Sequence, residues 1–187
     1  MQVPQLVPIL TMLYIITDTH FNHENIKKYC YRPDDFEIQI QQSLERLTKE
    51  DTLIHLGDIC MGKDLECHEK YIIPLPCKKI LVKGNHDKKT KTWYLNYGWN
   101  EVHDSYIVTM DDGKRILLSH EPIKNLENIS YNFHGHWHAK TKIEPERLPF
   151  PYTKKHIRVS LEWNGYQIME IEDIILANRV FETVEKI

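Results

Sequence analysis

The sequence lacks the features of a membrane protein, of a disulfide-stabilised domain and of a protein that binds nucleic acid through bulk charge. No apolar run approaches the roughly 20 residues of a membrane helix. Asp and Glu number 27 against 24 Lys and Arg, so no excess of positive charge favours a phosphate backbone. A nucleotide or nucleic acid held through metal ions is still compatible with this balance. The four cysteines form no CxxC pair, and we expect free thiols, buried or half-buried, in a reducing cytoplasm.

The first eleven residues also lack the features of a secretory signal. They are apolar in tone, but they have no positively charged start, and Pro4 and Pro8 interrupt them. We predict an N-terminal extension over residues 1–11, poorly ordered, followed by a single domain over residues 12–187. A chain of 187 residues is long enough for a substantial core, whereas two full domains would both be small.

Apolar runs alternate with helical patterns in the first half of the chain. Three continuous apolar runs are typical of strands covered on both faces, at residues 12–17, 52–58 and 78–87. Between the first two, apolar side chains recur at the spacing of one helix face, at Phe36, Ile40, Leu44 and Leu47. Weaker helical patterns follow at 65–73 and 88–98.

The second half of the chain is richer in strand patterns. Two β-like runs flank Asp111-Asp112-Gly113, a turn sequence typical of a hairpin. Further strands are predicted within 131–138 and 156–163, and a broad apolar stripe from Ile171 onward predicts a closing helix. This order favours a layered α/β domain with a mixed sheet or two packed sheets. Ligands of such folds bind beyond the carboxyl ends of the strands.

Side chains that can bind a metal ion or a phosphate follow five of the apolar runs, often beside glycine. They are Asp18 and His20; Asp58; Asn85, His86 and Asp87; His120; and His136 and His138. Each cluster alone has a structural explanation, such as a capped turn or a helix N-terminus. The five together are harder to explain, because burying so many ionisable groups without a counter-charge is costly. Two divalent cations would supply that charge.

These five blocks resemble the calcineurin-like metallophosphoesterases. The family pattern D-x-H, G-D, G-N-H-[DE], H and G-H-x-H is matched in order, with no metal-binding position missing, and the match spans residues 12–140. The opening DTHFNHENI is similar to small phage and bacterial phosphoesterases. The resemblance implies a four-layer α/β/β/α sandwich, in which two mixed sheets are flanked by helices.

The resemblance also implies a role for each matched residue. One metal ion would be held by Asp18, His20 and His138. The other would be held by Asn85, His120 and His136. Asp58 would bridge the two ions, and His86 would stand beside the leaving group without binding a metal. His134, on the same predicted strand face as His136 and His138, would support them by hydrogen bonding or packing.

This ligand set predicts hydrolysis of phosphate esters. A hydroxide bridging the metal ions would attack phosphorus, the metals and Asn85 would stabilise charge on the phosphoryl oxygens, and His86 would protonate the leaving oxygen. Asp87, or alternatively Asp104, would orient His86. The mixture of carboxylate, amide and imidazole ligands fits manganese, iron, zinc or nickel better than calcium.

Residues near the first cluster have open alternatives. His23 and Asn25 are candidates for binding the substrate phosphate, or else parts of a loop or helix cap. Lys27 and Arg32 are expected in solvent, and His55 is expected to be structural.

We therefore expect a dinuclear metal-dependent hydrolase of phosphate mono- or diesters in the cytoplasm. Nucleotides, cyclic phosphodiesters, nucleic-acid ends, phosphoproteins and small phosphate esters are all candidate substrates, and the oligomeric state is undetermined. The alternative is a non-catalytic metal-binding scaffold for protein interactions on the same fold, although such scaffolds usually lose the acid or a ligand. A mononuclear zinc module would need only His136, His138 and one partner, and would leave the other clusters unexplained.

Overall fold

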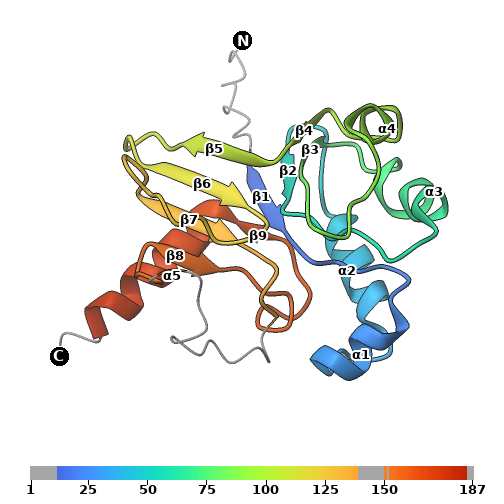
Figure 1. The fold of residues 1–187 in the computed structure, drawn as a ribbon, viewed down its shortest axis with the longest axis horizontal. Coiled ribbons are helices and arrows are strands. Elements are labelled where there is room, and N and C mark those ends of the chain that lie inside the picture. The colour runs from blue at the N-terminus through green and yellow to red at the C-terminus, as the bar shows by residue number, and fades with distance from the viewer. Residues whose placement is uncertain (1–11, 139–149, 151, 185–187) are drawn as a thin grey trace, which may run out of the picture.

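The computed structural model describes residues 12–138, 150 and 152–184, and two mixed β-sheets form its centre (Figure 1). The first sheet has the order β4-β3-β2-β1-β9. Its strands are Leu13–Ile16 (β1), Thr52–His55 (β2), Lys78–Val82 (β3), Glu101–His103 (β4) and Met169–Glu170 (β9). The second sheet has the order β5-β6-β7-β8. Its strands are Ser105–Thr109 (β5), Arg115–Ser119 (β6), Tyr131–His134 (β7) and His156–Arg158 (β8).

Parallel pairing gathers the polar segments at one edge of each sheet. Strands β1 to β4 are parallel, and only β9 is antiparallel to its neighbour. In the second sheet β5 and β6 form the predicted hairpin, while β6, β7 and β8 are parallel. All predicted metal ligands lie in the segments that follow β1, β2, β3, β6 and β7. Because parallel strands end at the same edge, these segments are close in space.

Two apolar clusters hold the layers together. One cluster packs one face of the first sheet, with Ile16, Leu53 and Leu81, against helices on that side. The other fills the space between the sheets, where Ile15 and Ile54 belong to the same cluster as Phe133 and other side chains of the second sheet. Strands buried on both faces explain the continuous apolar runs of the sequence.

The helices lie on both sides of the sheets, as Figure 1 shows. They are Glu24–Cys30 (α1), Phe36–Leu44 (α2), Asp64–Cys67 (α3), the π-helix His68–Ile72 (η1), Lys91–Asn96 (α4) and Ile171–Val184 (α5). Helices α1 to α4 gather beside the first sheet, and α5 lies near β8 and β9 on the other side. Two mixed sheets with flanking helices confirm the predicted fold class. None of the described helices is long and apolar enough to span a membrane.

Most predicted elements are present, but their ends differ. The sequence patterns missed α1 and the short strands β4 and β9, and the expected extension at 1–11 lies outside the described residues. The prediction that His136 and His138 continue a strand is wrong, since β7 ends at His134. The chain turns there because His136 takes a left-handed backbone, with φ 65°. The four cysteines are buried free thiols, as expected.

Glycine lets the loops that carry the candidate ligands touch. A Cβ atom at Gly135 would overlap the side chains of Thr17 and Asp18, and one at Gly84 would overlap the carboxylate of Asp58. Neither glycine has a positive φ, so glycine is needed at these positions because there is no space for a Cβ atom, and not for its backbone conformation. At Gly135 the loop after β7 of the second sheet therefore lies against the loop after β1 of the first, and at Gly84 two loops of the first sheet lie against each other.

Gly135→Ala should lower the free energy of unfolding by about 1–3 kcal/mol, because the added methyl overpacks this contact. Chemical denaturation of the metal-free protein measures the change. Gly113→Asn is the control, since Gly113 lies in open space with a φ of 81° that asparagine tolerates. An unchanged denaturation midpoint for Gly135→Ala would contradict the account.

Candidate metal centre

The loops that carry the predicted ligands are held in uncommon backbone conformations. Asp18, His20, Asp58 and His136 have φ values of 51°, 47°, 58° and 65°. Non-glycine residues adopt this left-handed region rarely, and strained backbone clusters at functional sites. Hydrogen bonds between loops hold the strain in place, since the N–H of Asp18 donates to Gly57 O at 2.9 Å and that of His20 to Asp58 O at 3.0 Å.

One group of candidate ligands consists of Asp18, His20 and His138. Their ligand atoms all lie within 4.8 Å of one another. His20 Nε2 is 3.8 Å from Asp18 Oδ1, and that buried oxygen has no hydrogen-bond partner among the described residues. A buried carboxylate oxygen without a donor is costly unless a cation faces it. The donor set therefore fits a metal ion.

A second group consists of Asp58, His120 and His136, whose ligand atoms also lie within 4.8 Å of one another. His120 Nδ1 is 2.8 Å from Leu56 O. A carbonyl oxygen only accepts, so Nδ1 carries the proton and Nε2 faces the site. His120 Nε2 lies 2.9 Å from Asn85 Oδ1 and 3.2 Å from His136 Nδ1. Asn85 therefore lies beside this group.

The carboxylate of Asp58 lies between the two groups. Its Oδ2 is 3.7 Å from His20 Nε2 in the first group and 3.4 Å from His120 Nε2 in the second. Its Oδ1 accepts a hydrogen bond of 2.8 Å from the backbone N–H of His86. One carboxylate therefore lies within 4 Å of candidate ligand atoms in both groups.

Charge is distributed unevenly over this cluster in the absence of a metal. Burial alone would raise the pKa of Asp58, but the hydrogen bond and charge of His120 lower it to about 2. Burial opposes protonation of His120, yet Asp58 and Asp18 raise its pKa to about 9. Burial lowers the pKa of His20 to about 2. The carboxylates are thus compensated by a histidine that a metal ion would have to deprotonate.

His86 lies at the mouth of the cluster. Its side chain is 38% exposed, and its Nε2 is 3.9 Å from Asp58 Oδ2. The ring packs edge-on to His20, with 5.6 Å between ring centroids. It is therefore close to both groups of ligands and open to an incoming substrate.

The two predicted phosphate contacts have different positions. His23 caps α1, where its Nδ1 accepts a hydrogen bond of 3.1 Å from the backbone N–H of Ile26. Its ring is also edge-on to His20, at 5.5 Å between centroids, so the cap lies beside the site. Asn25 is exposed in α1, and the structure does not place it in the described cluster.

Asp87 has a different role from the one predicted. Its buried carboxylate accepts hydrogen bonds of 2.8 Å from the N–H groups of Asp58 and Gly84 and one of 3.1 Å from Ile59. Both oxygens thus face backbone, and the prediction that Asp87 orients His86 is wrong. Burial raises the pKa of Asp87. The carboxylate fixes the loop after β3 against the loop that carries Asp58.

Two other histidines support the loops. His55 is buried, with its Nε2 3.0 Å from Thr19 Oγ1 and its Nδ1 accepting from the N–H of Gly57 at 3.0 Å. His134 is also buried, with Nδ1 2.9 Å from Gly135 O and Nε2 2.8 Å from Tyr152 Oη. Both roles match the structural and supporting positions expected for them.

Sequence patterns missed two residues of the site. Arg32, expected in solvent, is only 4% exposed, and its guanidinium donates to the carbonyl oxygens of Asp18 and Thr19. Glu162, which no motif singled out, pairs with Arg32 and with His138. Arg32 and Glu162 are 130 positions apart, so no local pattern predicts their contact.

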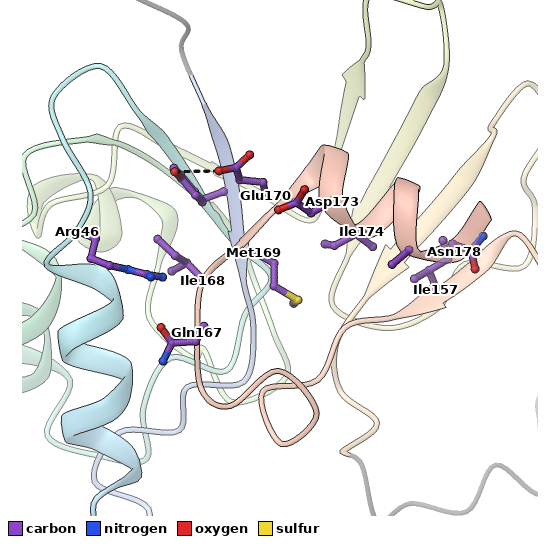
Figure 2. A pocket seen from close by; sticks show the side chains of 11 residues that line it. Arg46, Ile157, Gln167, Ile168, Met169, Glu170, Asp173, Ile174 and Asn178 are labelled. Atoms are coloured by element: carbon purple, nitrogen blue, oxygen red, sulfur yellow. Dashed lines mark hydrogen bonds between the residues drawn. The ribbon is translucent and has the colours of Figure 1, made fainter. Parts of the chain in front are cut away.

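A large cavity lies away from this centre. It has a volume of about 700 Å³ and opens beside β9 and α5 (Figure 2). Arg46, Ile168, Met169 and Ile174 are among the side chains that line it, and none of the predicted metal ligands is. The candidate metal centre is therefore separate from this cavity, in a cluster that opens to solvent at Asn85 and His86.

Comparison with known proteins gives this cluster a family context. The family model of the calcineurin-like phosphoesterases matches residues 12–164. An uncharacterized protein of Methanocaldococcus jannaschii is 30% identical over 172 residues, which cover 87% of this chain and 89% of that protein. The crystal structure of a protein of unknown function from Aquifex aeolicus has a TM-score of 0.70 at 32% identity, covering 90% of this chain and all of that one. The chain therefore belongs to the calcineurin-like phosphoesterase family, which at the family level hydrolyses phosphate esters with divalent metal ions.

Proposed function

We propose that this protein hydrolyses phosphate mono- or diesters at a dinuclear metal centre. Asp18, His20 and His138 would hold one cation, and Asn85, His120 and His136 the other. Asp58 would be shared. The observation that carries the proposal is the position of the Asp58 carboxylate, 3.7 Å from a ligand of one group and 3.4 Å from a ligand of the other.

The protein side chains would act around the bound ions. When bound, two divalent cations supply the charge that attracts a phosphate and activates water for attack on phosphorus. Asn85, which is exposed, can donate its amide N–H groups to a phosphoryl oxygen while its Oδ1 faces the metal group. His86, at the mouth of the cluster, can donate a proton to the leaving oxygen. His23 lies next to these groups and is a candidate contact for the phosphate.

The chemistry of the ligands limits which metal ions the site would bind, whereas the open site is compatible with several classes of substrate. Carboxylate, amide and imidazole donors favour manganese, iron, zinc or nickel. The open position of His86 is compatible with small esters, nucleotides and nucleic-acid ends alike. Four free buried thiols suit the reducing cytoplasm that we predict as its location.

A non-catalytic scaffold on the same fold is the competing proposal. It requires the metal cluster only as a structural element, so it assigns no role to an exposed histidine beside the ligands. His86 meets the geometric requirement for a general acid, which favours catalysis over a scaffold.

The purified protein should bind two transition-metal ions per chain and, with manganese, hydrolyse an aryl phosphate or an aryl phosphodiester. Asp58→Asn should lower metal content and reduce turnover by at least about 100-fold. Substitution of residues that only hydrogen-bond to a metal ligand already lowers metal affinity or activity by about 10–100-fold. Elemental analysis and a chromogenic assay measure both. Asp111→Asn in the exposed β5–β6 hairpin is the matched control. Metal-saturated protein that is inert on both esters, with Asp58→Asn unchanged in metal content, would refute the proposal.

His86→Ala should reduce turnover by about 10²–10⁴-fold, the usual contribution of a general acid, while both metals stay bound. The loss should be smaller for a nitrophenyl ester, whose leaving group needs little protonation, than for an alkyl ester. His103→Ala serves as control, since His103 is paired with Glu101 on the edge strand β4 and is not among the candidate ligands. Loss of metal from His86→Ala, or an equal defect on both esters, would contradict its assignment as the acid.

Stability without metal should depend on pH in a defined direction. Burial opposes the charge of His120 and His138, but their partners raise the pKa values from 6.5 to about 9 and about 10. A raised folded-state pKa stabilises the protein below pH 6.5, and that stability is lost as pH rises through 9 and 10. Metal binding requires neutral imidazoles, so metal affinity should increase over the same range. Thermal unfolding of metal-free and metal-loaded protein from pH 6 to 10 tests the opposite trends; parallel trends would contradict them.

A further inference from the structure

We infer that Arg32 and Glu162 form a buried positioning pair that shapes only one of the two metal sites, the one built from Asp18, His20 and His138. This inference rests on the proposed dinuclear centre. It assigns to two residues outside the family motif the task of fixing the ring of His138 and the strained loop at Asp18.

Glu162 sets the orientation of the His138 ring. Its Oε1 lies 3.1 Å from His138 Nδ1. Because Arg32 and Ser160 both donate to this carboxylate, it is an acceptor, and His138 Nδ1 must carry the proton. Nε2 then carries the lone pair with which His138 could bind a metal ion. A carboxylate behind a ligating histidine is the usual way in which proteins fix ring orientation and tautomer.

Arg32 fixes the backbone of the loop that carries the other two ligands, Asp18 and His20. Its Nη2 donates to Asp18 O at 2.8 Å and its Nη1 to Thr19 O at 3.0 Å. The same guanidinium contacts Glu162 Oε1 through Nε at 2.9 Å and Nη2 at 2.8 Å. The loop with left-handed Asp18 and His20 is thus joined to the residue that orients His138.

The pair itself is rigidly held. The Arg32 side chain is fully buried and Glu162 is 7% exposed at the side chain. The guanidinium carbon lies 5.1 Å from the ring centre of Phe36 and 5.9 Å from that of Tyr166. Ser160 Oγ donates to the second oxygen of Glu162 at 2.6 Å. A buried ion pair contributes little net stability, because desolvation offsets its attraction. Its main effect here is therefore geometric.

The second metal group uses a different support. His120 is oriented by the carbonyl oxygen of Leu56, and its other contacts are Asp58, Asn85 and His136. The backbone N–H of His136 also donates to Asp18 Oδ2 at 2.9 Å, but Arg32 contacts the carbonyl oxygen of Asp18 and not this carboxylate. None of these described contacts is made by Arg32 or Glu162 directly. Removal of the pair should therefore weaken one metal site and leave the other in place.

Titration of metal-free protein with Mn²⁺, followed by calorimetry, tests this asymmetry. Wild type should take up two equivalents, and Glu162→Gln should bind one of them about 10–100-fold more weakly while the other keeps its affinity. Arg32→Lys keeps the charge but loses the planar fork, so it should weaken the same equivalent. Glu101→Gln is the matched control, because Glu101 pairs with Lys78 at 2.7 Å and with His103 at 2.9 Å on the edge strand β4 and contacts none of the candidate ligands in these pairs.

Defined outcomes overturn the inference. Wild-type affinity for both equivalents in folded Glu162→Gln, equal weakening of both, or the same effect in Glu101→Gln would each refute it. Circular dichroism establishes whether each variant folds. If Glu162→Gln does not fold, Ser160→Ala replaces it and should weaken the binding of the same single equivalent of Mn²⁺. Unchanged affinity for both equivalents in Ser160→Ala would likewise refute the inference. Two bound metals without any esterase activity would refute the proposed function but not this inference.

Discussion

The carboxylate of Asp58 is the interaction on which the site depends, because it faces ligands that come from both sheets. His20 follows β1 of the first sheet, and His120 follows β6 of the second. To reach Asp58 from both sides, the loops must approach through backbone, and glycine at positions 84 and 135 provides the space. The left-handed conformations of Asp18, His20, Asp58 and His136 follow from the same requirement, since ordinary strand geometry would carry these side chains apart.

Electrostatics imposes the second constraint. Asp18 and Asp58 are buried beside the candidate histidine ligands, and their charge raises the pKa of His120 to about 9, so that without a cation His120 carries a compensating proton. When a divalent ion binds, it displaces the imidazole protons, and the positive charge that balances the carboxylates then comes from the metal. Arg32 is a permanent charge that does not exchange. It is directed at Glu162 and at carbonyl oxygens, and in this way it stabilises the loop without competing with a metal for Asp18.

The sequence predicted the parts of the fold and site that depend on local pattern. Apolar runs that end in Asp18, Asp58, Asn85 and His120 marked strand ends correctly, because buried parallel strands need continuous apolar residues. The alternation of histidines at 134–138 predicted a strand over all these positions, but the observed strand ends at His134. Periodicity carries no information on a turn that is imposed by contact with Thr17 and Asp18. The two-residue strand β9 is too short to leave a pattern. Arg32 and Asp87 were misassigned because their partners are backbone groups and a distant carboxylate.

Electron paramagnetic resonance of the Mn²⁺-loaded protein tests the central claim, that one carboxylate joins two metal sites. If Asp58 bridges, protein with two equivalents of Mn²⁺ gives the spectrum of a spin-coupled pair, and Asp58→Asn loses the coupling. If protein with two bound equivalents gives only the spectrum of isolated, uncoupled Mn²⁺ ions, the two groups of ligands are independent and the account is wrong.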